Sequence, residues 1–266
     1  MSSKKPKEQS NGEARFVEKV VGTVDLNCDM GEGIGNDEQI MPFISSANIA
    51  CGYHGGDKET IRETIELAIK YNVAIGAHVS FPDRENFGRT EMNLPAGEIR
   101  DLVTRQLIIL KDIADSFGIK MKHVKPHGAL YNMSAKDQVL AATIAEAVKA
   151  FDENLILFGL SGSPSIHEAK AVGLQTASEV FADRTYLDDG SLTARSKPNA
   201  LIENIDKAIQ QVLEMMTNGK VTTVTGKKVP VIAETICIHG DAKNAVQFAR
   251  NIYRQLNQNN IVIKAV

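Results

Sequence analysis

Short apolar segments alternate with longer amphipathic segments along this sequence, about seven times in all. Residues 155–158 are continuously apolar, which is typical of a strand buried on both faces. In residues 99–117, apolar side chains recur every three or four positions, which predicts a long helix that ends at Gly118. Because each helix carries the chain back across the sheet, such alternation predicts parallel strands. The short, buried strands favour a closed or nearly closed β/α barrel over an open, doubly wound sheet.

The chain has 266 residues, which is enough for one large domain with an ample core. Residues 1–18 are polar, rich in Lys, Glu and Ser, and lack the apolar stretch of a signal peptide. We therefore expect a disordered tail over residues 1–19 and a single domain over residues 20–266. Residues 221–231, with Gly226 near the middle, predict a β-hairpin inserted into that domain.

Charge and composition exclude several classes of protein. The formal net charge is −3 and no basic stripe occurs, which argues against a nucleic-acid partner. No apolar run approaches the roughly 20 residues that span a bilayer, so we expect no membrane partner. The 3 cysteines form no C-x-x-C motif, which favours reduced thiols and a cytoplasmic location over a disulfide framework or a structural zinc site.

The first apolar run leads into a segment that is unusually rich in polar side chains. Asp25, Asn27 and Asp29 alternate along a predicted strand, so their side chains point to the same face. Three polar groups on one face of an apolar strand are costly to bury unless that face opens onto a site. We therefore expect this strand, with Glu32 just beyond it, to form one wall of a functional site.

Other predicted strands end in similar chemistry. Of the 6 histidines, five lie at or next to a predicted strand end, namely His54, His78, His123, His127 and His239. Carboxylates share such positions at Asp29, Glu32, Asp183 and Asp241. In a β/α barrel the C-terminal ends of the strands converge on one face, where active sites lie. The pattern therefore predicts a functional cleft at that face.

The residue types are compatible with two classes of chemistry in this cleft. Histidines and carboxylates suit general acid–base hydrolysis, and they also suit a divalent metal ion that activates water. H-E-x-x-H does not occur, so the presence of a metal stays undecided. G-x-S-x-G is absent as well, and Asp29 would disfavour a thiolate at Cys28, so neither a serine nor a cysteine nucleophile is indicated.

Nucleotide-binding motifs are absent from the sequence. Residues 31–35 do not match G-x-G-x-x-G, and Glu32 within them would repel a pyrophosphate. No Walker A motif occurs, because Gly226 with its two lysines falls in the predicted hairpin turn. Any nucleotide would therefore bind in an unfamiliar manner or on another protein.

Several segments together resemble the LamB/YcsF family of 5-oxoprolinase A subunits. The matching segments are residues 25–32 (DLNCDMGE), 46–54 (SANIACGYH), 76–78 (GAH), 124–132 (VKPHGALYN), 179–184 (EVFADR) and 237–241 (CIHGD). They occur in the family's order and cover the chain from about Val24 to the end. The resemblance implies an incomplete β/α barrel of seven strands, similar to the glycoside hydrolase/deacetylase superfamily. It also implies ATP-dependent hydrolysis of the lactam 5-oxo-L-proline to L-glutamate, together with 5-oxoprolinase subunits B and C.

The sequence departs from the family pattern at a few positions. The family usually has Pro at position 79, Gly at 86 and Arg at 90, where this chain has Val79, Asn86 and Thr90. It usually has Phe-His-Ala-Gly where this chain has Tyr-His-Gly-Gly at residues 53–56. These departures bear on substrate preference and partner fit and leave the fold expectation unchanged.

On this resemblance we assign provisional roles to the predicted site residues. Proton transfer or water activation is expected of Asp29, Glu32, His54 and His127. Neutralisation of a developing oxyanion or a phosphate is expected of Lys125, Arg184 and His239. The remaining residues are expected to line or brace the substrate site: Asp25, Asn27, His78, Glu179, Asp183 and Asp241. ATP would bind this chain or a partner subunit, and a divalent metal stays an open question.

Two alternatives remain beside this interpretation. One is a metal-dependent deacetylase or amidohydrolase that works alone on a carbohydrate or a cyclic amide. The other is a subunit that binds a carbohydrate or metabolite without catalysis.

Overall fold

A computed structural model describes residues 22–240 and 244–266 of the chain. The predicted tail, residues 1–19, and Asp241 lie outside the described residues. None of the described helices is long and apolar enough to cross a membrane.

Seven parallel strands form a closed barrel, as the alternation of segments predicts. In order around the barrel they are β1 (Gly22–Met30), β2 (Ser46–Ala50), β3 (Ala74–Val79), β4 (His123–Pro126), β5 (Ile156–Leu160), β6 (Gln175–Phe181) and β9 (Thr235–Ile238). The ring closes because β9 pairs with both β6 and β1. It has one strand fewer than a complete β/α barrel, so the fold implied by the resemblance is confirmed.

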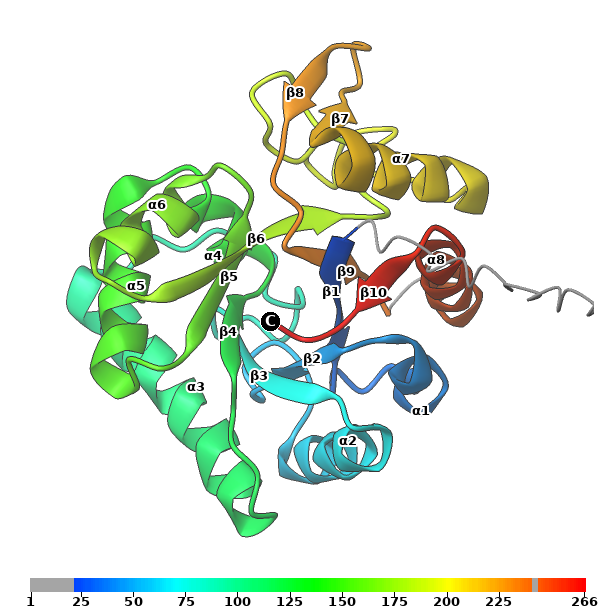
Figure 1. The fold of residues 1–266 in the computed structure, drawn as a ribbon. Coiled ribbons are helices and arrows are strands. Elements are labelled where there is room, and N and C mark those ends of the chain that lie inside the picture. The colour runs from blue at the N-terminus through cyan, green and yellow to red at the C-terminus, as the bar shows by residue number, and fades with distance from the viewer. Residues whose placement is uncertain (1–21, 241–243) are drawn as a thin grey trace, which may run out of the picture.

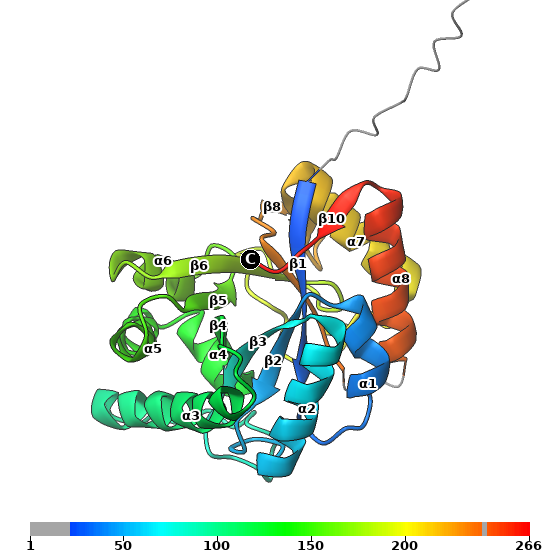
Figure 2. The same ribbon diagram turned by 60° about the horizontal axis from the view of Figure 1, so that its bottom comes forward.

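Helices surround the outside of the strands (Figures 1 and 2). They are α1 (Asp37–Ile40) with the 3₁₀ turn η1 (Met41–Phe43), α2 (Lys58–Tyr71), α3 (Ala96–Ser116), α4 (Gly128–Ser134), α5 (Gln138–Phe151), α6 (Pro164–Ala171), α7 (Ile205–Asn218) and α8 (Ala245–Gln258). The long helix predicted over residues 99–117 is α3, and its apolar face is buried against the barrel. Asp57 caps the N-terminus of α2, because its carboxylate accepts a hydrogen bond from Thr60 N at 2.9 Å.

Two smaller strand pairings complete the structure. The last strand, β10 (Ile261–Ile263), pairs in parallel with the first residues of β1. Strands β7 (Lys220–Thr222) and β8 (Lys228–Pro230) form an antiparallel hairpin, as predicted, and it projects beside α7 in Figure 1.

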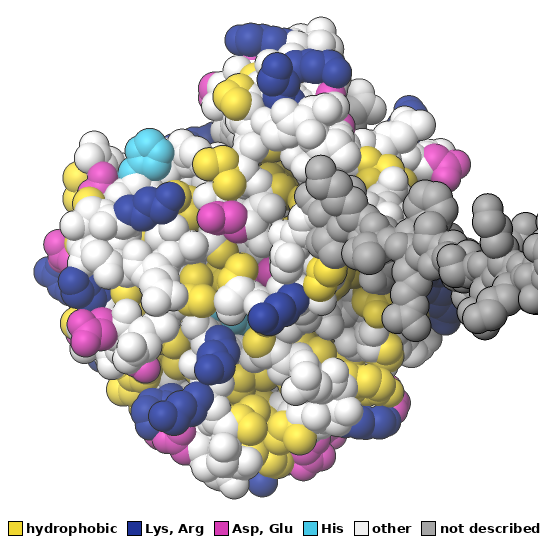
Figure 3. Space-filling model, viewed as in Figure 1, with side chains coloured by type: hydrophobic (Ala, Val, Ile, Leu, Met, Phe, Trp, Pro, Cys, Tyr) yellow, Lys and Arg dark blue, Asp and Glu magenta, His cyan; other side chains and the backbone are white. Residues whose placement is uncertain are grey.

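On the face drawn in Figure 3, basic and acidic side chains are interspersed.

Apolar side chains fill the layer between strands and helices, and this leaves the barrel interior to the polar ones. Along β1, Leu26 and Cys28 belong to the apolar layer, whereas Asp25, Asn27 and Asp29 hydrogen-bond to residues of other strands. As predicted from the alternation, the polar side chains of β1 lie on one face, and this face points into the barrel interior.

Candidate active site

A column of polar side chains from β1 runs along the barrel interior toward the C-terminal ends of the strands. At its deep end, three hydroxyl groups donate to the Asp25 carboxylate: those of Ser45 at 2.6 Å, Ser46 at 2.7 Å and Thr235 at 2.5 Å. Burial raises the pKa of Asp25, and these three hydrogen bonds oppose that rise. Asn27 lies next in the column and donates to Glu179 at 2.9 Å. Asp29 lies nearest the open end and is 8% exposed.

Lys125 on β4 crosses the interior to this column. Its ammonium lies 2.8 Å from Asp29 Oδ1, 3.0 Å from Glu179 Oε1 and 3.1 Å from Cys237 Sγ. Burial favours a neutral amine, yet the charges of Asp29 and Glu179 outweigh it and raise the pKa of Lys125 well above its usual range. Burial likewise opposes ionisation of Asp29, but His78 and Lys125 hold its pKa well below the ordinary value. The site therefore contains a buried, charged ammonium–carboxylate pair.

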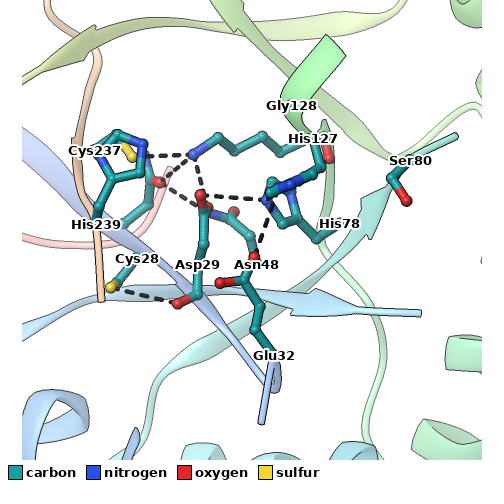
Figure 4. Close-up of polar contacts among 12 residues, drawn as sticks. Cys28, Asp29, Glu32, Asn48, His78, Ser80, His127, Gly128, Cys237 and His239 are labelled. Carbon is teal, nitrogen blue, oxygen red and sulfur yellow. Dashed lines mark hydrogen bonds and ion pairs between the residues drawn. The ribbon is translucent and has the colours of Figure 1, made fainter. Parts of the chain in front are cut away.

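Three imidazoles gather beside Asp29, from the ends of three different strands. The rings of His54 and His127 stack at a centroid distance of 3.8 Å, and His78 meets both rings edge-on. His78 Nε2 lies 2.9 Å from His127 Nδ1 and 3.3 Å from Asp29 Oδ2. Glu32 Oε1 lies 3.2 Å from His54 Nε2 and 3.6 Å from His127 Nδ1. Figure 4 shows His78 and His127 on one side of Asp29, with Cys237 and His239 on the other.

Burial lowers the pKa of both stacked imidazoles. For His54 the neighbouring His78 acts in the same direction, and for His127 both His54 and His78 do. Burial disfavours the charged form of a histidine, and like charges nearby disfavour it further. The two stacked rings are therefore neutral bases near pH 7, suited to accept a proton or to ligate a metal.

The loop between β3 and α3 holds the imidazoles in place through its backbone. The Asp83 carboxylate accepts hydrogen bonds from Asn86 Nδ2 at 2.9 Å and from Thr90 N at 3.0 Å, which shapes the loop. Phe87 adopts a left-handed φ of 57° and its carbonyl oxygen lies 2.8 Å from His127 Nε2. A Cβ at Gly88 would come within 2.9 Å of the His127 ring, so this position needs glycine. Two of the departures from the family pattern, Asn86 and Thr90, thus lie in the loop that positions His127.

These groups border a cleft of about 400 Å³ at the C-terminal ends of the strands. Seven of the predicted site residues line it: Asp29, Glu32, His78, Lys125, His127, Arg184 and His239. Five others do not line it: Asp25, Asn27, His54, Glu179 and Asp183. His239 forms a second Asp–His pair, in which its Nδ1 is 2.8 Å from Asp183 Oδ2. The structure thus brings most of the predicted residues to one place.

Two arginines and a buried hydroxyl group also line the cleft. Arg184 and Arg195 both line it, and Arg184 is fixed by donating to the Thr193 carbonyl at 2.6 Å. Within the described residues, Tyr131 Oη and Glu179 Oε2 are buried without a hydrogen-bond partner. Tyr131 lines the cleft, so its hydroxyl group is available to a bound ligand, whereas Glu179 does not line it. The two arginines and this hydroxyl group fit a small anion that also carries hydrogen-bonding groups.

His123 is the one strand-end histidine that the structure places elsewhere. It begins β4, at the opposite end of the strand from His127, so its predicted place at the C-terminal face is wrong. Its ring stacks on Phe158 and bonds Asn48 Oδ1 at 2.8 Å. A Cβ at Gly76 would lie 2.2 Å from this ring, so glycine on β3 makes room for it. His123 is a supporting residue of the barrel interior.

The free energy of unfolding should decrease in acid because of His123. Burial lowers its pKa to about 3, with Lys125 and His78 acting in the same direction. The ring stays neutral in the folded chain, whereas the unfolded chain takes up this proton near pH 6.5, its usual pKa. Stability from this residue is therefore complete above about pH 6.5 and is lost at about 1.4 kcal/mol per pH unit as pH falls toward the folded pKa. Urea denaturation at a series of pH values measures this slope.

A His123→Asn variant should show a smaller slope than the wild type in the same series. His167→Gln, which removes a more accessible imidazole on α6, is the matched control. Equal slopes for His123→Asn and the wild type would contradict this account.

Several residues that support the site were not predicted from the sequence. Asn48 donates to Asn27 Oδ1 at 2.8 Å and to Asp29 Oδ1 at 2.9 Å. Ser80 Oγ lies 2.8 Å from His54 Nδ1. Ser80 follows His78 by two residues, so strand alternation could have indicated it. Phe87 acts through its backbone carbonyl, which no side-chain pattern reveals.

Two groups of side chains have the spacing of metal ligands among the described residues. One contains Glu32, His54, His78 and His127, and the other contains Asp29, Cys237 and His239. In each group the candidate ligand atoms lie within 4.8 Å of one another. All three cysteines of the chain, Cys237 included, are free and buried.

Comparisons with known proteins agree with this architecture. The LamB/YcsF family model matches residues 24–266. A protein from Tolumonas auensis that is named as the A subunit of 5-oxoprolinase is 52% identical, over 91% of this chain and 99% of its own length. A protein of the same name from Bacillus cereus is 51% identical, over 91% of this chain and 98% of its own.

A solved structure is also similar over nearly the whole chain. The crystal structure of a lactam utilization protein from Thermus thermophilus is 41% identical and superposes with a TM-score of 0.86. The match covers 92% of this chain and 100% of that one. With the family model, the relatives and the fold in agreement, this chain belongs to the LamB/YcsF family.

Proposed function

We propose that this chain is the lactam-hydrolysing subunit of an ATP-dependent 5-oxoprolinase, a cyclic amide hydrolase that opens 5-oxo-L-proline to L-glutamate. The names of its relatives support the substrate class. One structural observation carries the assignment to this chain. Proton-transfer groups, among them Asp29, line the same cleft as two arginines, Arg184 and Arg195.

The chemistry of 5-oxoproline fits both sets of groups. The substrate is a small carboxylate that carries a lactam ring, and a cleft of about 400 Å³ is at the lower end of the usual range for small ligands. Arg184 and Arg195 are suited to hold its carboxylate by charge-assisted hydrogen bonds. The lactam carbonyl would then lie toward Lys125, whose ammonium stabilises negative charge on that oxygen.

Asp29, Glu32, His54 and His127 would activate the attacking water and move its proton. The neutral imidazole of His127 is suited to accept that proton, and the charges of Asp29 and Glu32 stabilise the imidazolium that results. His239 would assist Lys125 from the other side of Asp29. The supporting residues hold this arrangement: Asp25, Asn27, His78, Glu179, Asp183 and Asp241.

ATP would enter through partner subunits. An unstrained lactam resists hydrolysis, and phosphorylation of its carbonyl oxygen to an imidate would activate it. This chain contains neither a Walker A nor a G-x-G-x-x-G motif. We assign phosphoryl transfer to subunits B and C and hydrolysis to this chain.

Reconstitution tests this division of labour. Glutamate release from 5-oxoproline and ATP is expected only when this chain and subunits B and C are combined. Subunits B and C without this chain should form little glutamate, and this chain by itself should form none. If B and C without it release glutamate at the rate of the complete mixture, the proposal is wrong.

A second candidate function is hydrolysis of an amide or acetyl group by this chain alone, with a metal ion as activator. The three clustered imidazoles favour it. Turnover of a cyclic amide or an acetylated sugar by the isolated chain, without ATP, would establish it over the first proposal.

A further inference from the structure

We propose that the Tyr131 hydroxyl group makes the cleft specific for a lactam, by donating a hydrogen bond to the lactam carbonyl oxygen. Tyr131 lies on α4, and its side chain lines the cleft. It is not one of the site residues predicted from the sequence. The inference rests on the proposed function, because it takes 5-oxoproline as the ligand.

Tyr131 Oη is a buried group without a partner in the protein. The residue is 5% exposed, and nothing in residues 22–240 and 244–266 forms a hydrogen bond with this oxygen. Burying a hydroxyl group without a hydrogen bond is costly, because the group loses the water that solvates it in the unfolded chain. Since Tyr131 lines the cleft, an oxygen atom of a bound ligand can supply the missing acceptor.

The hydroxyl group keeps its proton and can therefore donate. Burial raises the pKa of Tyr131 well above its usual range, and the charge of Glu179 acts in the same direction. Glu179 Oε2 likewise has no hydrogen-bond partner in the described part of the chain. Glu179 is thus the alternative acceptor for the Tyr131 proton, and the two acceptors predict different behaviour of a Tyr131→Phe variant.

Lys125 uses its N–H groups within the protein. An ammonium group carries three N–H donors. Its shortest contacts are to Asp29 Oδ1 at 2.8 Å, Glu179 Oε1 at 3.0 Å and Cys237 Sγ at 3.1 Å. Lys125 therefore supplies positive charge to a ligand oxygen, whereas the hydrogen bond comes from another group. The unpartnered hydroxyl group of Tyr131 is suited to provide it.

Tyr131 and Lys125 adjoin the same two residues. The ring of Tyr131 packs edge-on against Phe181 with the centroids 5.6 Å apart, and Lys125 Nζ lies 5.6 Å from the centroid of the same Phe181 ring. Glu179 contacts the ammonium at 3.0 Å, and its charge also acts on the hydroxyl group. An oxygen atom that accepts a hydrogen bond from Tyr131 is therefore also stabilised by the charge of Lys125.

The lactam carbonyl suits this position better than the carboxylate of the same ligand. A carboxylate beside Glu179 would be repelled, whereas a carbonyl oxygen carries no net charge. Arg184 and Arg195 line the same cleft and are suited to hold the carboxylate. A buried donor that only the correct ligand satisfies also rejects an analogue without the acceptor, because the donor is then left unpaired. Tyr131 thus favours a cyclic amide over a ring without a carbonyl.

Calorimetric titration of the full chain with two ligands tests this role. 5-Oxo-L-proline carries a lactam and a carboxylate, whereas cyclopentanecarboxylate has a ring of the same size and only the carboxylate. Tyr131→Phe should raise the Kd of 5-oxoproline by about 5–100-fold, the usual effect of leaving one polar partner unpaired. It should leave the Kd of cyclopentanecarboxylate unchanged. Tyr253→Phe, which removes a hydroxyl group on α8 and outside the cleft lining, is the matched control and should bind both ligands as the wild type does.

Thermal unfolding of the variants separates this role from a structural one. Tyr131→Phe should not lower the Tm, because its hydroxyl group has no protein partner to lose. Tyr186→Phe should lower the Tm, because Tyr186 Oη accepts a hydrogen bond from Phe181 N at 2.8 Å. If Tyr131→Phe lowered the Tm as much and left binding unchanged, the hydroxyl group would be a donor to Glu179 and the inference would be wrong.

An equal loss of affinity for both ligands in Tyr131→Phe would also overturn the inference, because the hydroxyl group would then not distinguish the lactam. Either result leaves the 5-oxoprolinase assignment in place, since the wild type still binds 5-oxoproline. If the wild-type chain bound no 5-oxoproline, the assignment of this ligand to the cleft would fail, and the role of Tyr131 would fail with it.

Discussion

Replacing Asp29 with Asn is expected to lower the kcat for glutamate formation by the complete enzyme by about 10²–10⁴-fold, the usual contribution of general acid–base catalysis. Asp29 lies on the floor of the cleft, where its carboxylate contacts both Lys125 and His78. Asparagine has nearly the same size as aspartate, but it lacks the negative charge that interacts with Lys125 and His78. His127→Gln should have an effect of the same order, because it removes the imidazole that faces Glu32 and His78. Initial rates with saturating ATP and partner subunits measure both effects.

Asp152→Asn is the matched control for this charge removal. Asp152 is exposed at the end of α5, remote from the residues that line the cleft. The variant should retain the wild-type rate. Rates close to wild type in both Asp29→Asn and His127→Gln would mean that these residues do not carry the reaction.

Replacing Lys125 with Met should lower the free energy of unfolding by about 3–5 kcal/mol, the usual effect of removing one partner of a buried ion pair. Methionine fills nearly the same volume, so the effect comes from charge. Without the ammonium, Glu179 would be left as a buried carboxylate without an ion-pair partner, and Asp29 would keep only His78. Urea denaturation of the full chain near pH 7 measures the change.

A surface pair gives the matched comparison. Lys228 lies 2.7 Å from Glu214, but its side chain is 59% exposed. Lys228→Met should therefore change stability by less than about 1 kcal/mol. Adding Glu179→Gln to Lys125→Met should restore part of the lost stability, because it removes one unpaired charge. If Lys125→Met were no more destabilising than Lys228→Met, the buried charges would not be paired as described.

Both predictions depend on the same feature, a barrel interior built from polar residues. Bulky apolar side chains usually dominate the interior of β/α barrels. Here Asp25, Asn27, Asp29 and Lys125 occupy it, and their charges and amides must be paired to be buried at all. An apolar interior would be at least as stable, so the polar residues indicate a function for the interior.

The sequence was sufficient for the fold and for part of the site. Strand alternation placed Asp25, Asn27 and Asp29 on one face, because side chains in a strand alternate regardless of what surrounds them. The convergence of His54, His78 and His127 followed from barrel geometry, since the C-terminal ends of parallel strands meet at one face. Roles for these residues stay predictions until the variants are measured.

Other features could not be predicted from the sequence. His123 looked like another strand-end histidine, but its place depends on where β4 begins, and strand boundaries are poorly defined by local pattern. Asn48 looked like an ordinary polar residue in a small-residue strand, yet it links Asn27 to Asp29 across the interior. Its partners lie on another strand, 21 and 19 positions away in the chain, and meet it only through strand register.

The sequence by itself determined the alternating architecture, the inward polar face of β1 and the set of strand ends that supply the chemistry. These properties follow from local periodicity and from a few short motifs. Only the tertiary structure decided which nitrogen of each imidazole faces the cleft, that Lys125 lies between Asp29 and Glu179, and that the Phe87 carbonyl holds His127. Those outcomes depend on distances between atoms of different strands and loops. Such distances arise from barrel closure and from loop backbone conformation, which no local pattern encodes.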